Sequence, residues 1–153
     1  MKQSVVEGTW FAVPLRSGGF AVGAVARTAA SGGVILAYFF RTVWEQLPSM
    51  DDVKHLDPDS AVRILRVGDL AIINEDWAVI GHDQDWHRDR WPVPRFVRRD
   101  DLSRRAWAVE YGDDANVVIS ETPIEYESTL ERDAVLGTGA AEIVLTRTLS
   151  PAK

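Results

Sequence analysis

The sequence of 153 residues contains no cysteine. A disulfide framework, a thiolate nucleophile and a zinc site with cysteine ligands are therefore excluded. Long apolar runs are also absent, because the longest, residues 34–40, is far below the roughly 20 residues that cross a membrane. The opening residues, MKQSVVEGTWF, lack the apolar stretch of a signal peptide. These absences lead us to expect a soluble cytoplasmic protein.

Positive charge is scarce as well. The chain has 17 lysines and arginines against 23 aspartates and glutamates, which gives a formal net charge of −6. General nucleic-acid binders obtain most of their affinity by neutralising phosphates, so this balance argues against that class. Basic or neutral partners remain compatible with it.

The size and composition are those of an ordinary globular protein. Hydrophobic residues make up 46% and charged residues 26%, enough apolar material for a substantial core. Two domains would each be too small to be comfortably stable, so we expect a single domain that spans residues 1–153.

The first forty residues have a strong strand pattern. Residues 8–15 (GTWFAVPL) and 19–27 (GFAVGAVAR) are rich in aromatic and β-branched residues, with a glycine-rich turn, RSGG, at 16–19. A second turn at 31–33 precedes VILAYFF at 34–40, which is apolar throughout. The pattern predicts a three-stranded meander whose third strand is buried on both faces.

The remainder of the chain is more mixed. Further predicted elements are a short helix within 48–57 with Ser49 as N-cap, a strand at 61–67, a hairpin formed by strands at 70–74 and 77–81, a second hairpin at 105–121, a helical turn within 128–137 and a closing strand at 141–149. Together these predict a β-dominated α+β fold, a strongly curved antiparallel sheet or partly closed barrel with one or two short helices. The expected core residues are Trp10, Phe11, Val13, Phe20, Val22, Val25, Ile35, Tyr38, Phe39, Ile64, Ile72, Val79, Ile80, Trp107, Val109, Ile143 and Leu145.

One segment, residues 85–107, departs from the acidic character of the chain. It holds three of the six tryptophans and seven arginines, together with Pro92 and Pro94. The tryptophans and arginines could stack bases and contact phosphates, could hold the fold together, or could form a protein interface. The tryptophans argue against disorder, and the two prolines favour extended backbone at the residues before them. We therefore expect an ordered segment that is mainly structural and can still present a surface.

The sequence contains no complete catalytic or metal-binding motif. His82, Asp83, Asp85 and His87 lie close together and could in principle serve a metal-dependent hydrolase, but their spacing matches no ligand signature. The glycine-rich SGGFAVG lacks the ending of a phosphate-binding loop, and no GxSxG motif occurs. We expect no enzyme activity, no cofactor and no metal.

Four blocks of sequence resemble the immunity protein 26 family of bacterial polymorphic toxin systems. They are GTWFAVPLRSGGFAVGAVAR, LAYFF, GDLAIINEDWAVIG and WHRDRWPVPRFVRRDDLSRRAW, in that order. The resemblance implies a small cytoplasmic protein, encoded near a toxin, that neutralises the toxin by binding and has no catalytic residues. The alternative is a nucleic-acid-binding module that uses residues 86–107.

If a protein is the partner, its contacts are expected in two places. One is the segment rich in arginine and tryptophan, and the other is the acidic stretch 110–131, which could mimic phosphate or be a solvated face. The candidate partner-binding residues are Trp86, Arg88, Arg90, Arg95, Arg98, Arg99, Asp113, Asp114 and Glu121.

Overall fold

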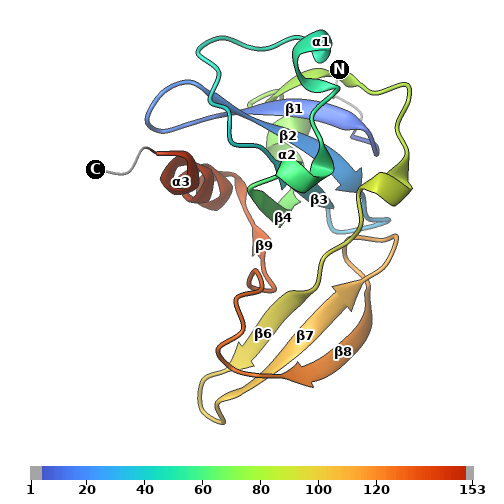
Figure 1. Cartoon of the computed structure of the whole chain (residues 1–153), viewed down its shortest axis with the longest axis vertical. Coiled ribbons are helices and arrows are strands. Elements are labelled where there is room, and N and C mark those ends of the chain that lie inside the picture. The colour runs from blue at the N-terminus through green and yellow to red at the C-terminus, as the bar shows by residue number, and fades with distance from the viewer. Residues whose placement is uncertain (1–4, 151–153) are drawn as a thin grey trace.

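The structure is a computed structural model, and it describes residues 5–150. Its elements, in chain order, are β1 Thr9–Pro14, β2 Phe20–Arg27, β3 Val34–Phe39, α1 Met50–Val53, η1 Pro58–Ser60, β4 Arg63–Gly68, α2 Leu70–Ile73, β5 Ala78–His82, η2 Arg88–Arg90, β6 Phe96–Asp100, β7 Arg105–Tyr111, β8 Val118–Ile124, β9 Val135–Leu136 and α3 Thr138–Leu149. The strands form a six-stranded and a three-stranded sheet, and Figure 1 shows the smaller sheet projecting below the larger. The predicted β-dominated α+β class is confirmed; the strands build two sheets rather than a barrel.

The larger sheet has the strand order β5-β1-β2-β3-β4-β9. Neighbouring strands are antiparallel except β9, which runs parallel to β4. The predicted meander is confirmed as β1, β2 and β3. The turn between β1 and β2 requires glycine, because Gly18 and Gly19 have φ angles of 99° and 76°.

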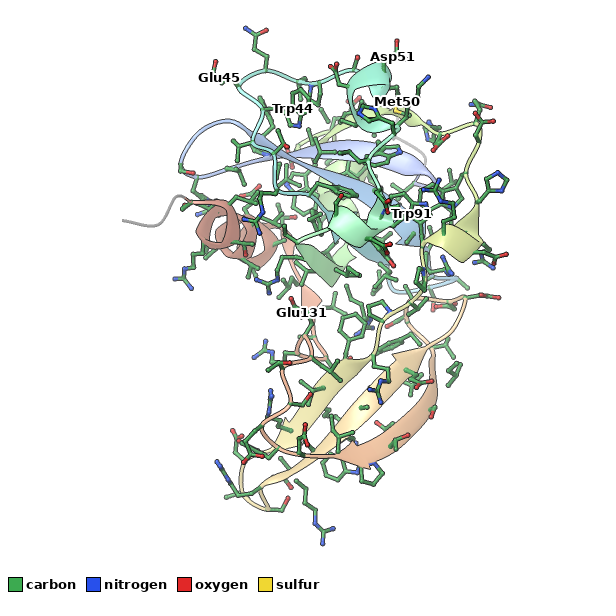
Figure 2. All side chains as sticks on the ribbon, in the orientation of Figure 1. Trp44, Glu45, Met50, Asp51, Trp91 and Glu131 are labelled. Carbon is green, nitrogen blue, oxygen red and sulfur yellow. The ribbon has the colours of Figure 1, made fainter. Side chains whose placement is uncertain are left out.

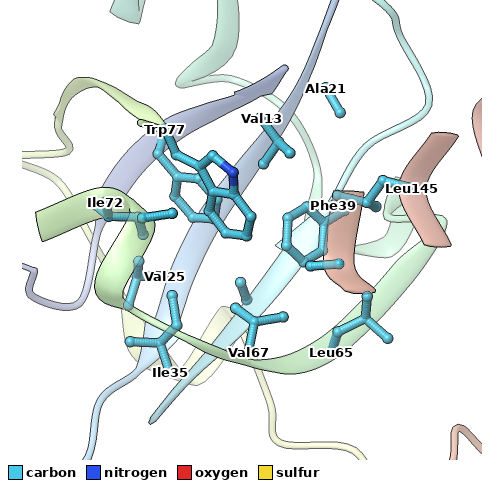
Figure 3. Packing of buried hydrophobic residues seen from close by; sticks show 14 of the residues in the cluster. Val13, Ala21, Val25, Ile35, Phe39, Leu65, Val67, Ile72, Trp77 and Leu145 are labelled. Carbon is cyan, nitrogen blue, oxygen red and sulfur yellow. The ribbon is translucent and has the colours of Figure 1, made fainter. Parts of the chain in front are cut away.

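Both faces of the larger sheet are apolar. On β3, Ile35 and Phe39 contribute to one buried cluster, whereas Leu36 and Tyr38 contribute to another on the opposite face. This explains why the strand reads as a continuous apolar run in the sequence. Figure 3 shows the first cluster, where residues of α2 and α3 pack over the strands.

The smaller sheet has the order β6-β7-β8 and is antiparallel throughout. The hairpin predicted at 105–121 is confirmed as β7 and β8. At the end nearer the larger sheet, Phe96, Val109 and Tyr111 are buried in the second cluster together with Trp10 and Leu36. The two sheets therefore share an apolar cluster.

A buried arginine also joins the two sheets. Arg66 on β4 is only 5% exposed and donates to the carbonyl of Ala115 (2.9 Å), to Asp133 (3.1 Å) and to the side-chain oxygen of Asn116 (3.2 Å). Its guanidinium lies 3.9 Å from the ring centroid of Tyr111, whose hydroxyl donates to Asp133. Each of the three guanidinium nitrogens thus donates a hydrogen bond at the junction, which offsets the cost of burying the charge.

A second connection runs along the edge of β6. The backbone of Val97 donates to Glu131 and accepts from Asp133, both at 2.8 Å. The side chain of Glu131 pairs with Arg63 on β4. Figure 2 shows Glu131 between the two sheets. The chain segment that leads to β9 therefore closes one edge of the smaller sheet.

The hairpin predicted for 70–74 and 77–81 is wrong. Residues 70–73 form α2, and β5 pairs with β1 at the far side of the sheet from β4. The chain must cross a sheet face between β4 and β5, and α2 makes this crossing while burying Ala71 and Ile72.

The closing strand predicted at 141–149 is also wrong, because these residues belong to α3. Ala141 and Leu145, four residues apart, lie on one helix face and are buried against the first cluster. Ile143 lies off that face and is 38% exposed, which corrects its assignment to the core. The helical turn predicted within 128–137 is absent; those residues are irregular up to β9.

The remaining core predictions largely hold. Phe20, Ile64, Val79, Ile80 and Trp107 are only partly buried, while the other predicted core residues apart from Ile143 are buried. The short helix predicted after Ser49 is α1, and the strand predicted at 61–67 is β4. In α1 the carboxylate of Asp52 accepts a hydrogen bond from the backbone N–H of Ser49 at 2.9 Å.

Candidate partner-binding surface

The tryptophans of the segment 85–107 begin with a stacked pair. The rings of Trp86 and Trp91 are 4.6 Å apart with an interplanar angle of 22°. Trp91 is 4% exposed and meets Trp10, Tyr38 and Phe40 edge-on at 5.8, 5.0 and 6.2 Å. Figure 2 shows Trp91 beside the point where the chain passes to the smaller sheet. Trp91 is therefore part of the core, and Trp86 covers it.

The backbone around the prolines is also held in place. The hydroxyl of Tyr38 donates to the carbonyl of Pro92. Burial raises the pKa of Tyr38 to about 12, so this donor keeps its proton at neutral pH. Beyond the prolines, Phe96 is 1% exposed and begins β6. The prediction of an ordered segment is confirmed, and the strand β6 within it was not predicted.

Gly8 makes room for the first tryptophan. Its φ angle is 87°, and a Cβ atom there would lie 3.2 Å from Cβ and Cγ of Trp86. A larger residue would strain the backbone and displace the ring. The glycine before Thr9 was therefore a sequence signal for close contact, although the sequence alone did not name its partner.

Arg88 connects three separate parts of the chain. Its guanidinium donates to Glu7 twice, at 3.0 and 2.7 Å, and lies 3.1 Å from Asp113. The hydrogen bonds to Glu7 raise the pKa of Arg88 above its usual value. Two of the candidate residues, Arg88 and Asp113, are thus brought together as an ion pair.

Two further candidates meet on one face of the smaller sheet. Arg98 pairs with Glu121 at 3.1 Å, and its guanidinium lies 4.4 Å from the ring centroid of Trp107. The strand register explains this, because Arg98 is opposite Trp107 on β7 and Trp107 is opposite Pro123 on β8. The side chains of Arg98 and Glu121 are 45% and 43% exposed, so both are accessible to a partner.

The other candidate arginines differ in their engagement. Arg99 donates to the carbonyl of Tyr126 at 2.7 Å and also bonds the carbonyl of Ser128. Arg90 and Arg95 are exposed, and neither has an ion pair within residues 5–150. Much of the cationic charge of this segment is thus bound to the chain itself.

Asp114 has a local structural role. Its carboxylate accepts from the backbone N–H groups of Ala30 at 3.0 Å and Asn116 at 2.8 Å. These hydrogen bonds lower the pKa of Asp114. The residue thereby links the turn before β8 to the chain after β2.

The smaller sheet carries surface features that the sequence reasoning missed. At the end farther from the larger sheet, a hollow of about 430 Å³ is lined by residues of the β6–β7 turn, β7, β8 and the chain that follows, namely Arg104, Arg105, Ala106, Trp107, Pro123, Ile124, Glu125, Tyr126 and Glu127. Along β8, the apolar residues Val118 and Ile119 are exposed. The sequence signal for these surface features was the alternation of acidic and apolar residues in PIEYE, residues 123–127. An edge strand and a solvated loop share this alternation, so it did not identify a surface.

The histidine cluster has no ligand geometry. His82 ends β5, and the carboxylate of Asp83 accepts from the backbone N–H of Asp85 at 2.9 Å, which forms a turn. Within residues 5–150 no group of three or more histidine, cysteine, aspartate or glutamate residues is arranged to hold a metal ion. The same residues contain no helix that is long and apolar enough to cross a membrane.

These observations define a β-dominated protein that combines a deeply buried sheet with a projecting, charged one. The chain belongs to the family Immunity protein 26, whose family model matches residues 6–108, more than half of the chain. No curated protein and no solved structure matched the chain. The match ends inside β7, so β8, β9 and α3 lie beyond it.

Proposed function

We propose that this chain neutralises a toxin of a bacterial polymorphic toxin system by binding to it directly in the cytoplasm, without catalysis. Its membership of the family Immunity protein 26 carries this proposal. A protein inhibitor needs a stable scaffold and a complementary surface, and no reactive group.

The scaffold supports this function physically. A sheet buried on both faces gives a rigid platform, because its side chains interdigitate with covering elements on each side. The net charge of −6 favours encounter with a basic partner through electrostatic steering. An acidic inhibitor is therefore suited to a toxin whose own surface is basic.

The partner-binding residues remain a proposal. We propose that the exposed side chains of Arg90, Arg95, Arg98, Asp113 and Glu121 contact the toxin. Trp86 and Arg88 would act mainly by holding the segment in position, since Trp86 stacks on the buried Trp91 and Arg88 donates two hydrogen bonds to Glu7. Arg99 and Asp114 bond backbone groups and would support neighbouring turns.

Co-expression with the toxin domain encoded beside this gene tests the proposal. We expect growth to be restored and a stable complex to be purified, and we expect no protection against a toxin from an unrelated system. Titration separates binding from catalysis. A binding inhibitor must reach one copy per toxin for complete neutralisation, whereas an enzyme that inactivates the toxin would act at a small fraction of that ratio. Absence of both rescue and complex would refute the proposed function.

A further inference from the structure

Strand β8 has an outer edge that no strand within residues 5–150 pairs with. It is the last strand of the smaller sheet, and most of its residues are exposed. Val117, which precedes the strand, and Val118 and Ile119, which begin it, are 52%, 45% and 64% exposed. Contiguous exposed apolar residues on a soluble protein are typical of an interaction surface.

The hollow continues this surface at the other end of β8. The residues that line it include the rings of Trp107 and Tyr126 together with Pro123 and Ile124. Aromatic rings beside a concave surface are the side chains that most often form the energetic centre of a protein interface. Apolar contacts are therefore available at both ends of the same strand.

The charge around this strand indicates the sign of the charge that a partner would carry. Residues 96–131 contain four arginines and nine carboxylates, so they carry −5 of the chain's net charge of −6. Residues 110–131 contain seven carboxylates and no lysine or arginine. Among the described residues, Glu110, Glu125 and Glu127 have no ion-pair partner. The potential beside β8 is thus negative and only partly compensated by the chain itself.

The nearby arginines do not reverse this potential. The guanidinium of Arg104 lies 4.0 Å from the ring centroid of Tyr126, and that of Arg98 pairs with Glu121 over Trp107. Arg105 also lines the hollow and has no ion pair among the described residues, but the four arginines of residues 96–131 are outnumbered by nine carboxylates. Glu125 and Glu127, on the chain that follows β8, are exposed and free to bind a cation from outside.

We propose that β8 and the adjoining hollow form the surface on which the toxin docks, and that the toxin contributes an apolar centre flanked by lysine or arginine side chains. This inference rests on the proposed function and names its surface. Recognition occurs through side chains rather than by addition of a strand, because Pro123 lacks the N–H that a continuous added strand would use. The surface lies beyond the matched residues 6–108, apart from Arg104, Arg105, Ala106 and Trp107 in the hollow.

Affinity measurements on the complex with the adjacent toxin domain test this surface. The double variant Glu125→Gln/Glu127→Gln is expected to bind at least about tenfold more weakly and to lose part of the salt dependence. Ile119→Ser is expected to weaken binding by a similar factor, with its melting temperature near that of the parent because the side chain is exposed. The matched control Glu45→Gln/Asp76→Asn removes the same charge from exposed positions outside the smaller sheet and should change affinity less than about twofold. Figure 2 shows Glu45 at the opposite end of the molecule.

The outcomes separate the surface from the function. If the parent neutralises the toxin and the β8 variants bind as tightly as the parent, the surface is refuted and the function stands. If the parent neutralises no toxin, the function fails.

NMR titration with an octa-arginine peptide then tests the surface alone. Shifts concentrated at Trp107 and residues 119–127 support it, and shifts elsewhere, or no shifts, overturn it. Tight, salt-dependent binding of single-stranded DNA through the arginine-rich segment would likewise overturn it.

Discussion

The two sheets of this protein differ in how far their strands are buried. In the larger sheet, β1 and β3 are almost wholly inaccessible to solvent, and successive side chains of β3 alternate between the two apolar clusters. In the smaller sheet, β8 is largely exposed and only the end beside the larger sheet is buried. Stability is therefore concentrated in the larger sheet, whereas the net charge and the accessible surface are concentrated in the smaller one.

The comparison also shows how a thin sheet can remain ordered. Three strands with a single buried end are marginal on their own, and they need packing against another element. The second apolar cluster, Arg66 and Glu131 supply that packing. We therefore propose that the two sheets unfold together as one domain over residues 1–153.

The largest expected effect comes from removing the tryptophan at the shared cluster. Trp91→Ala should lower the free energy of unfolding by about 3–5 kcal/mol, because it deletes a buried ring that contacts four other aromatic residues. Thermal or chemical unfolding measures this, with the exposed Arg90→Ala as control, expected within about 0.5 kcal/mol. A Trp91→Ala variant that melts like the parent would show that the ring is a surface contact instead.

Breaking the charged junction should have a comparable or somewhat smaller effect. Arg66→Met keeps the apolar volume but leaves Asp133 without its cation, at a cost of about 3 kcal/mol. Because Arg66 couples the sheets, its loss should allow the smaller sheet to open separately, so amide hydrogen exchange in β7 should accelerate more than exchange in β1. Arg16→Met, which removes a partly exposed ion pair with Glu142, is the matched control and should leave exchange in β7 unchanged. Equal acceleration in both sheets would refute the idea of a specific junction.

Alkaline pH should weaken the contacts of two buried tyrosines, Tyr111 at this junction and Tyr38 beside Trp91. Burial raises the pKa of both Tyr38 and Tyr111 to about 12, above the usual value of 10, and the hydrogen bond from Tyr111 to Asp133 adds to its shift. A raised folded-state pKa contributes stability that is complete below pH 10 and is lost as the pH rises from 10 to 12. Unfolding measured across this range should show declining stability in the parent and a shallower decline in Tyr38→Phe/Tyr111→Phe. Equal slopes would contradict the assignment.

The smallest expected effect concerns the ion pair on the exposed face of the smaller sheet. Arg98→Ala or Glu121→Gln should change the free energy of unfolding by no more than about 0.5 kcal/mol, because both side chains are nearly half exposed. The much larger change in the free energy of unfolding expected for Trp91→Ala distinguishes the buried scaffold from the exposed surface. A loss of several kcal/mol would place this face within the structural core instead.

The arrangement of the candidate partner-binding residues was only partly predictable from sequence. The prolines and tryptophans indicated an ordered segment, and the structure places Trp91 in the core as expected for a structural role. The pairing of Arg88 with Glu7, and of Arg98 with Glu121, joins residues that are 81 and 23 positions apart. Charges of both signs are scattered through the sequence, so only the folded arrangement decides which of them cancel.

Local pattern was sufficient where neighbouring residues decide the conformation. The meander of β1, β2 and β3, the helix α1 and the hairpin of β7 and β8 each depend on apolar runs and nearby turn or cap residues, and all were predicted. The family resemblance also came from blocks of the sequence rich in tryptophan, glycine and proline, and the family model that matches residues 6–108 confirms it.

The tertiary structure alone decided α2, α3 and the placement of β6. In residues 141–149 the β-branched side chains favour a strand, yet burial of Ala141 and Leu145 on one face favours a helix over the first cluster. Likewise, whether residues 70–74 pair with 77–81 depended on the position of β1, which is distant in sequence and offers β5 its hydrogen-bonding edge. The sequence by itself determined the strands that are apolar on both faces; long-range packing determined how the remaining segments cover them and which charged surface they leave exposed.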